Sequence, residues 1–113
     1  YAVACDIHPV NNLRVLKYLS NELGVDEQAK AAWYRHWVEL GFEKIEMMLS
    51  ENNEFCVGNT PTLADICLVP QVFNALRFNV DMAAYPKIAA IYARCNVLPA
   101  FSDAAPQNQR DAV

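Results

Sequence analysis

The sequence lacks a long apolar run, a cluster of basic residues and any strand-like pattern longer than three residues. A helix that crosses a bilayer needs about 20 apolar residues, whereas the most apolar stretch, residues 66–70, is far shorter. We therefore expect no membrane span. The formal net charge is −4, and the Lys and Arg residues are scattered along the chain. This pattern cannot neutralise a phosphate backbone, which excludes nucleic acid as a partner.

The sequence also lacks a closely spaced pair of cysteines. Its four cysteines fall mostly within apolar helical patterns: Cys5, Cys56, Cys67 and Cys95. We interpret them as buried free thiols of a cytoplasmic protein, and we expect no metal site. A disulfide framework and a zinc site are the alternatives.

The length of 113 residues and the hydrophobic content of 54% are sufficient for one compact domain with its own core. We assign this domain to residues 1–102 and interpret residues 103–113 as a loose polar tail. Tyr1 is not an initiator Met, and the opening residues lack the basic start of a signal peptide. We therefore expect a fragment that begins near the end of an amphipathic helix.

The turn and capping residues are those of helices throughout, so we predict an all-α fold of about five helices. Pro9 disfavours a helical backbone at His8 and is expected to end the first helix there. Asn11 is expected to cap the second helix, and Gly24 supplies its left-handed stop. The apolar positions of this second helix recur at a spacing of three and four residues: Leu13, Leu16, Leu19 and Leu23.

A long third helix is predicted from Asp26 and Glu27 to about Glu51, because acidic residues favour the positive end of a helix dipole. Gly41 in its middle predicts the close approach of another helix. The predicted core face is a stripe of large apolar residues: Trp33, Trp37, Leu40, Ile45, Met48 and Leu49. An aromatic ligand-binding box is the alternative to core packing for this stripe.

The most hydrophobic helix is predicted over residues 63–78, and it should run through the centre of the domain because nearly every face is apolar. Pro70 inside it should bend its axis. Thr62 and Asp65 have the capping-box spacing, in which the two residues exchange hydrogen bonds at the start of a helix. We interpret this pair as structural, and a catalytic acid at Asp65 is the alternative.

A further helix is predicted to begin at Pro86, since the missing N–H of proline is harmless at a first helical position. The sequence Leu-Pro-Ala-Phe at residues 98–101 is expected to close the domain.

His8, Asn12 and Arg14 bring hydrogen-bonding groups to the interruption between the first two helices. They are either helix caps and solvated side chains or a ligand site. A helix N-terminus attracts an anion, and a guanidinium binds a carboxylate through two hydrogen bonds. Arg77 near the end of the apolar helix is a second isolated guanidinium. It either binds the last carbonyls of its helix or Asp81, or it binds an anion.

Together these motifs resemble the C-terminal domain of the glutathione transferases. The resemblance covers residues 1 to about 102 and rests on Thr-Leu-Ala-Asp, on the later Tyr-Pro-x-Ile and on Leu-Pro-Ala-Phe. Within that family the stretches HPVNNLRVLKYL (residues 8–19) and FCVGNTPTLADICLVPQVFNALRFNVDMAAYP (residues 55–86) are similar to the zeta class, the maleylacetoacetate and maleylpyruvate isomerases.

The resemblance implies a homodimer of two-domain subunits in the cytoplasm, with a thioredoxin-like N-terminal domain that is absent from this chain. In the family that domain binds the cofactor glutathione and keeps its sulfur as a thiolate. The thiolate adds to the cis double bond of a maleyl group, the resulting single bond rotates, and elimination leaves the trans product. No catalytic residue is therefore expected in this chain, which should be inactive alone.

Carried over by motif position, His8, Asn12 and the main chain at Leu13 would lie near glutathione. Arg14 and Arg77 would bind the two carboxylates of a small dianionic maleyl substrate. Animal zeta enzymes tend to carry Gln and Ser at the positions of His8 and Arg14. That departure is typical of bacterial enzymes and leaves open which maleyl acid is preferred.

The expected function is thus that of the substrate-side domain of an enzyme, a glutathione-dependent maleylacetoacetate isomerase of aromatic amino acid catabolism. A maleylpyruvate isomerase is one alternative. A general glutathione transferase is another, and it would need an apolar second pocket. A non-catalytic helical interaction module is the third, and it would not need Arg14 and Arg77 to converge.

Overall fold

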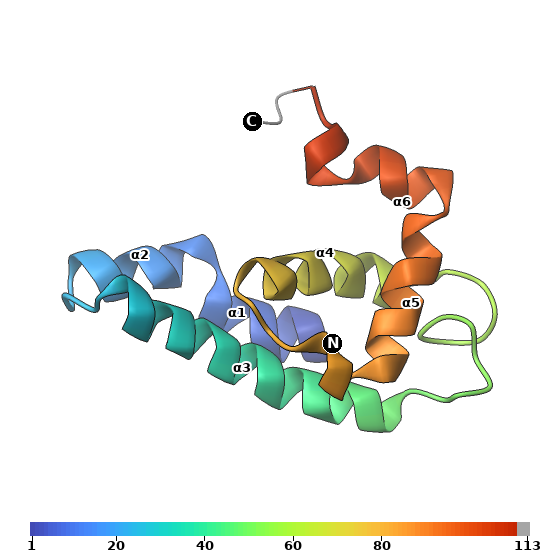
Figure 1. Ribbon diagram of the computed structural model, residues 1–113, viewed down its shortest axis with the longest axis horizontal. Helices are drawn as coiled ribbons and strands as arrows, with labels where there is room; N and C mark the ends of the chain where they lie inside the picture. Colours follow the sequence, from blue (N-terminus) through green and yellow to red (C-terminus); the bar gives the residue numbers. More distant parts are fainter. Residues whose placement is uncertain (111–113) are drawn as a thin grey trace.

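Helices make up all the regular secondary structure of the computed structural model, which describes residues 1–110 (Figure 1). The predicted all-α fold is therefore confirmed. The elements follow in the order η1 (Ala2–Ile7, a π-helix), α1 (His8–Asn11), α2 (Leu13–Asn21), α3 (Glu27–Met48), α4 (Leu63–Arg77), η2 (Met82–Ala84), α5 (Pro86–Asn96), α6 (Pro99–Ala104) and η3 (Pro106–Asn108).

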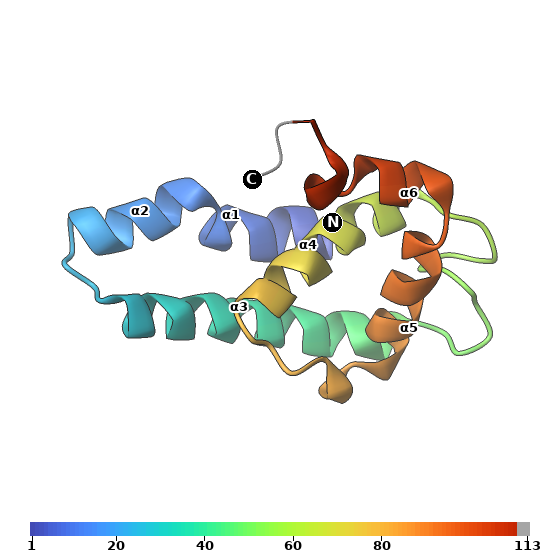
Figure 2. The same cartoon turned by 45° about the horizontal axis from the view of Figure 1, so that its top comes forward.

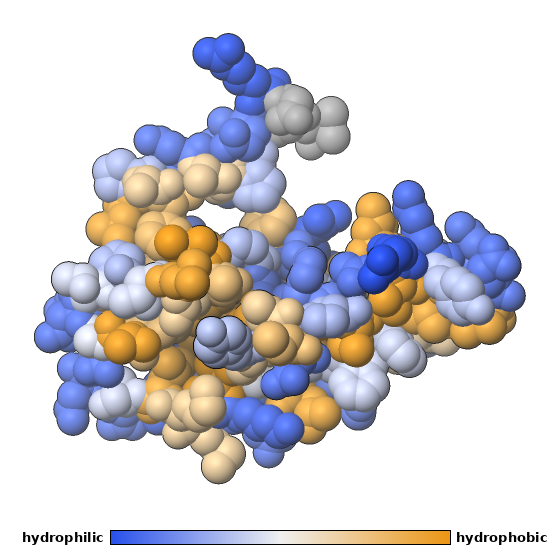
Figure 3. All heavy atoms as spheres, turned by 180° about the vertical axis from the view of Figure 1, so that it is seen from behind, coloured by the Kyte–Doolittle hydropathy of each residue, from blue (hydrophilic) through white to orange (hydrophobic). Residues whose placement is uncertain are grey.

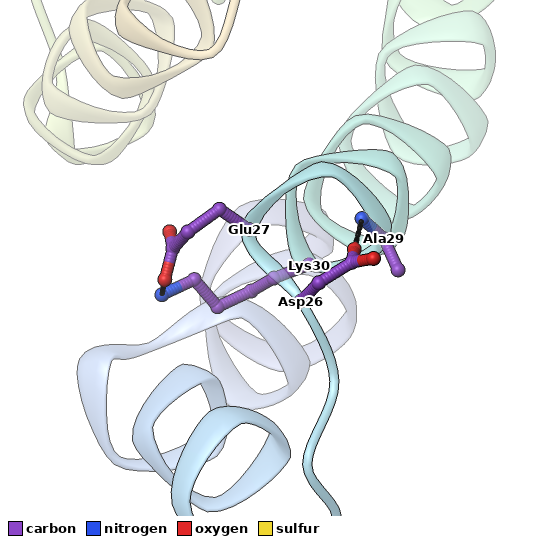
Figure 4. Close-up of polar contacts among 4 residues, drawn as sticks. All are labelled: Asp26, Glu27, Ala29 and Lys30. Atoms are coloured by element: carbon purple, nitrogen blue, oxygen red, sulfur yellow. Dashed lines mark hydrogen bonds and ion pairs between the residues drawn. The ribbon is translucent and has the colours of Figure 1, made fainter.

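The 22-residue helix α3 is the element against which most of the domain packs. The helices η1, α1, α2 and α5 all contact it, and α4 contacts η1 and α5 (Figures 1 and 2). Asp26 caps α3 as predicted, because its Oδ1 accepts a hydrogen bond from the N–H of Ala29 at 2.7 Å. An ion pair of 3.0 Å between Glu27 and Lys30 lies in the same turn (Figure 4).

The core face of α3 agrees with the predicted stripe at Ile45 and Leu49 and differs from it elsewhere. Trp33 and Trp37 are only half-buried, while Leu40 and Met48 are exposed. The residues buried on α3 recur on the same 3.6-residue period. They are Tyr34, Val38, Phe42 and Ile45, with Leu49 just beyond the end of the helix. Ile45 and Leu49 are therefore buried as predicted, whereas the phase of the predicted stripe was wrong over the first part of the helix.

The close approach predicted at Gly41 is confirmed. A Cβ atom at this position would lie 2.5 Å from both Cγ1 and Cδ1 of Ile7 in η1. Gly24 likewise has the left-handed φ expected of a residue that ends a helix, at +67°.

The break between the first two helices is displaced from the predicted position. His8 has a helical backbone, with φ −59° and ψ −42°, and the chain continues through Pro9. The N–H of His8 donates to the carbonyl of Val3, which is the wide turn of a π-helix. Pro9 follows this turn and occupies the first turn of α1, where a missing N–H is tolerated.

The true interruption is at Asn12, which has an extended backbone and caps α2 in place of Asn11. Of the four leucines in the predicted apolar pattern, Leu16 and Leu19 are buried. Leu13 is exposed, because α2 presents a single face to α3, and Leu23 lies beyond the end of α2 and is exposed as well.

Helix α4 does not run through the centre of the domain, and this corrects the prediction. One face is buried, with Leu68, Gln71, Val72 and Ala75. The opposite face leaves large apolar side chains exposed, at Leu63, Ile66 and Leu76. Hydropathy alone could not separate a helix buried on all sides from one whose second apolar face is uncovered.

The capping box at the start of α4 is present. Pro86 opens α5, as predicted, and the carboxylate of Glu46 on α3 caps this helix from outside. Glu46 accepts hydrogen bonds from the N–H groups of Lys87 at 2.6 Å and Ile88 at 3.0 Å. These bonds satisfy two of the donors that a helix start leaves free.

The predicted domain boundary at residue 102 lies inside α6, and η3 follows it. Asn108 Nδ2 donates to the carbonyl of Ser102 at 2.6 Å, so this part of the predicted tail folds back on α6. Residues 111–113 of that tail lie outside the described residues. In residues 1–110, no helix combines the length and the apolar character of a membrane span. No group of three His, Cys, Asp or Glu side chains in the same range is placed to hold a metal ion.

Candidate functional site

Asn12 shapes the junction between α1 and α2, which is the first part of the candidate site. Its Oδ1 accepts from the N–H of Val15 and its Nδ2 donates to the carbonyl of Pro9, both at 3.1 Å. The amide therefore bridges the end of one helix and the start of the next. One amide N–H and one oxygen lone pair of Asn12 are not used by these two bonds.

The other predicted residues of this junction are exposed. His8 begins α1, Leu13 begins α2, and Arg14 follows it. The main-chain N–H groups of Leu13 and Arg14 belong to the first turn of α2 and have no acceptor within residues 1–110. Free N–H groups at the positive end of a helix favour an anion.

Asn11 has a different role from the predicted cap. It is buried, and its Nδ2 donates at 3.0 Å to the main-chain carbonyl of Tyr34 on α3. Its Oδ1 is buried and has no hydrogen-bond partner in the described part of the chain. Trp33 Nε1 donates to the carbonyl of Val10 at 3.0 Å. These two bonds hold the junction against α3.

Arg77 is the last residue of α4, and its side chain is exposed. Its guanidinium donates to no acceptor within residues 1–110 and forms no ion pair there. Asp81 instead caps η2 by accepting from the N–H of Ala83 at 3.0 Å. The two structural roles that the sequence left open for Arg77 are therefore not used.

Phe78, directly after Arg77, is held by two neighbouring residues of α3. Its ring stacks on Tyr34, with centroids 3.9 Å apart and an interplanar angle of 14°. Its carbonyl accepts from Nη1 of Arg35 at 3.3 Å. Asn79 then turns the chain with a left-handed φ of +62°. The end of α4 is thus fixed, while the Arg77 side chain points away from the core.

Tyr34 links the two parts of the candidate site, a role that was not predicted from the sequence. Its main chain binds Asn11, its ring stacks on Phe78, and its hydroxyl accepts from Nε2 of Gln71 at 3.4 Å. Burial raises the pKa of the Tyr34 phenol, while the hydrogen bond from Gln71 and the positive charge of Arg77 oppose this rise. The charge of Arg77 therefore acts on the residue that also holds the α1–α2 junction.

Asp65 has no free oxygen for catalysis. It is fully buried, with Oδ2 accepting from the N–H of Thr62 at 2.8 Å and Oδ1 from the N–H of Cys56 at 3.0 Å. Burial first, and then the carboxylate of Asp65, raise the pKa of the Cys56 thiol to about 12. This arrangement fixes the loop before α4 and supports the structural reading of Thr62 and Asp65.

The four cysteines are free, but only Cys95 is fully buried, which corrects the expectation for the others. Cys5 is exposed, and Cys56 and Cys67 are half-buried.

An apolar hollow of about 410 Å³ lies between α4, α5 and α6. Ile66, Pro70 and Phe73 of α4 face Tyr92 of α5 and Phe101 of α6 across it. The back view shows an opening at this level between the C-terminal segment and the body of the domain (Figure 3). The candidate polar residues His8, Asn12, Arg14 and Arg77 do not line this hollow.

Comparison with known proteins assigns the family. Residues 11–103 match the family model described as "Glutathione S-transferase, C-terminal domain". The chain is 54% identical over 111 residues to a probable maleylacetoacetate isomerase of Vibrio cholerae, an alignment that covers 97% of this chain and 52% of the relative.

Two solved structures have the same fold over nearly the whole chain. One is the holo structure of a maleylpyruvate isomerase, described as a bacterial glutathione transferase of the zeta class. It has a TM-score of 0.95 and 47% identity, over 99% of this chain and 54% of that one. The other is a maleylacetoacetate isomerase of Anaeromyxobacter dehalogenans with bound dicarboxyethyl glutathione and citrate. It has a TM-score of 0.90 and 32% identity, over 99% of this chain and 50% of that one.

The chain thus spans about half the length of the relatives that it matches. Its match to the family model covers most of its residues, and its fold matches that of a zeta-class enzyme. The chain belongs to the glutathione transferase family, in which it forms a C-terminal domain of the zeta class.

Proposed function

We propose that this chain is the substrate-side domain of a glutathione-dependent cis-trans isomerase that acts on a small maleyl dianion. Maleylacetoacetate is the proposed substrate, as an intermediate of aromatic amino acid breakdown. The observation that carries the proposal is the pair of exposed guanidiniums at Arg14 and Arg77, which have no partner within residues 1–110 and lie on two segments that Tyr34 contacts.

The α1–α2 junction supplies the groups proposed to face glutathione. Asn12 keeps one amide N–H and one oxygen lone pair after its two local bonds, and the N–H of Leu13 has no acceptor in the described part of the chain. His8 adds an exposed imidazole one helical turn earlier. The Anaeromyxobacter relative holds a glutathione derivative, which supports glutathione as the cofactor here.

Arg14 and Arg77 are proposed to bind the two carboxylates of the substrate. A guanidinium binds a carboxylate through two parallel hydrogen bonds. The addition of the glutathione thiolate to the double bond creates enolate-like negative charge. Two fixed cations near that charge would stabilise the transition state more than the ground state. The dicarboxyethyl group and the citrate bound to the relative are themselves carboxylate-rich.

The thiolate is proposed to belong to a thioredoxin-like domain in the other half of the enzyme. The apolar hollow and the uncovered face of α4 support this partner, because exposed apolar patches of this kind mark an interface. The full-length enzyme is the protein that contains this domain as well as residues 1–113. A dimer is proposed as well, since α3 exposes Met47 and Met48 away from its core face. The four free thiols fit a cytoplasmic enzyme.

The decisive experiment is an assay of the full-length enzyme with glutathione and maleylacetoacetate or its analogue maleylacetone. We expect isomerisation that requires glutathione, and none from residues 1–113 alone. Arg77→Ala should reduce kcat/KM, and the reduction should correspond to a loss of about 2–4 kcal/mol of transition-state binding. Turnover that is independent of glutathione, or normal turnover by Arg77→Ala, would contradict the proposal.

Maleylpyruvate is the second candidate substrate, because the 47% identical structural relative is a maleylpyruvate isomerase. The same assay with both acids distinguishes them. A non-catalytic interaction module predicts no isomerisation of either acid.

A further inference from the structure

Tyr34 holds both of the proposed carboxylate-binding segments through different parts of one residue. Its carbonyl oxygen accepts from Asn11 at 3.0 Å, and Asn11 immediately precedes the Asn12 cap that starts the helix of Arg14. Its ring stacks on Phe78, which immediately follows Arg77. A single residue of a long helix therefore lies between the two segments and contacts each of them.

Arg35 adds an independent hold on the second segment. Its Nη1 donates to the carbonyl of Phe78 at 3.3 Å, at the C-terminal end of α4 where carbonyls lack partners within the helix. Phe78 is thus fixed by its ring and by its main chain. Arg77, one residue earlier, cannot move along its own helix axis without breaking one of these contacts.

These contacts are shielded from solvent, because Tyr34 is only 3% exposed and Asn11 only 6%. The amide of Asn11 donates to Tyr34, although its Oδ1 is buried and has no partner among residues 1–110. An unsatisfied buried acceptor costs free energy. An apolar residue would fill such a position without that cost, so the bond to Tyr34 has a positional value beyond packing.

We propose that Tyr34 and Arg35 are positioning residues that set the distance between Arg14 and Arg77, and that this distance selects the length of the substrate dianion. The inference rests on the proposed function, in which the two arginines bind the two carboxylates of one molecule. Neither Tyr34 nor Arg35 touches the reacting atoms. Their effect is exerted through the segments that they hold.

The two candidate substrates differ in the separation of their two carboxylates. Maleylacetoacetate carries one more methylene than maleylpyruvate between its distal ketone and its distal carboxylate. Two cations at a fixed separation bind only one of these lengths with both carboxylates well placed, because a misplacement of about 1 Å costs much of the benefit of orientation. If the segments of Arg14 and Arg77 were held less firmly, substrates of either length should bind, but neither should have both carboxylates well placed.

The test uses three variants of the full-length enzyme. Arg35→Met removes the hydrogen bond to Phe78 and keeps an apolar side-chain stem. Arg35→Lys is the conservative control, because it retains a cationic donor. Phe78→Leu removes the aromatic stack by a separate route. For each variant kcat and KM are measured with maleylpyruvate and with maleylacetoacetate, and the ratio of the two kcat/KM values gives the substrate preference.

We expect Arg35→Met and Phe78→Leu to reduce the preference by about tenfold, mainly through a higher KM for the preferred acid. Arg35→Lys should recover part of it. A general loss of folded enzyme lowers both activities equally and leaves the ratio unchanged. An unchanged ratio in every variant that folds would therefore overturn the inference, as would a wild-type enzyme that does not distinguish the two acids.

The control Arg77→Ala separates this inference from the proposed function. If Arg77→Ala loses activity while the ratio is unchanged in Arg35→Met, the positioning role is wrong and the carboxylate-binding role stands. If Arg77→Ala is fully active, both are overturned.

Discussion

Ile7 and Gly41 are so close that a Cβ atom on Gly41 would lie 2.5 Å from two carbon atoms of the Ile7 side chain. Both residues are in helices that cross at this point, and Ile7 is completely buried. The absence of a side chain on Gly41 therefore sets how near η1 can come to α3. Since η1 leads directly into α1, this contact also places the α1–α2 junction relative to α3.

Gly41→Ala should lower the free energy of unfolding by about 1–3 kcal/mol, although alanine is the better helix former, because the new methyl group overpacks the contact with Ile7. Urea denaturation of the chain measures this effect. The double variant Gly41→Ala with Ile7→Ala removes the clashing atoms. It should be less destabilised than the sum of the two single changes, and strict additivity would show that the contact is not the cause.

Glu46→Ala should lower the free energy of unfolding by about 2 kcal/mol, because it leaves the N–H groups of Lys87 and Ile88 without an acceptor at the start of α5. Thermal or urea denaturation measures it. Glu43→Ala is the matched control, since Glu43 is an exposed acid on the same helix whose side chain makes no hydrogen bond within residues 1–110. Equal losses in the two variants would contradict the capping role.

Cys56 should make the fold sensitive to alkali. Burial raises the pKa of its thiol from the ordinary 9.0 to about 12, so the folded state keeps the proton where the unfolded chain loses it. The stability that this thiol contributes is full below pH 9 and is lost progressively as the pH rises toward 12.

The measurement compares the wild type with Cys56→Ala by urea denaturation from pH 7 to about 10.5. The wild type should lose stability more steeply above pH 9, because other titrating groups are common to both proteins. Parallel curves would show that Cys56 does not titrate differently in the folded and unfolded states.

Arg14→Ala should lower the kcat/KM of the full-length enzyme for a maleyl dianion, because Arg14 is proposed to bind one carboxylate. The loss should correspond to about 2–4 kcal/mol of transition-state binding. Lys17→Ala is the control, because Lys17 is another exposed cation of α2. A general effect of positive charge would lower the kcat/KM of both variants alike, and this loss would become smaller with added salt. A selective loss in Arg14→Ala supports direct binding.

Local rules predicted much of this fold. Asp26 at the start of α3, Thr62 and Asp65 at the start of α4, Pro86 at the start of α5 and Gly24 at the end of the α2 segment all occur where capping chemistry predicts them. These signals depend on neighbours within four residues, so a single sequence contains them.

Features that depend on partners far along the chain could not be predicted in the same way. Tyr34 was missed because its three contacts come from α1, from α4 and from the residue after α4, and nothing near it in the sequence marks them. Helix α4 was placed in the centre because an apolar face looks alike whether it meets the core or lies open. At Pro9, the rule for a residue before proline was overridden by the wide turn of η1.

The wide turn of η1 also absorbs one residue in the chain that leads to the α1–α2 junction. A π-helical turn holds one residue more than an α-helical turn. If one residue between Ala2 and Ile7 were deleted, the stretch could close into ordinary α-helix, and His8 would keep about the same rotation relative to the preceding chain, because each α-helical residue turns the chain further than a π-helical one. Relatives that keep the His-Pro sequence but lose this extra residue should therefore aim the same imidazole at the same neighbour.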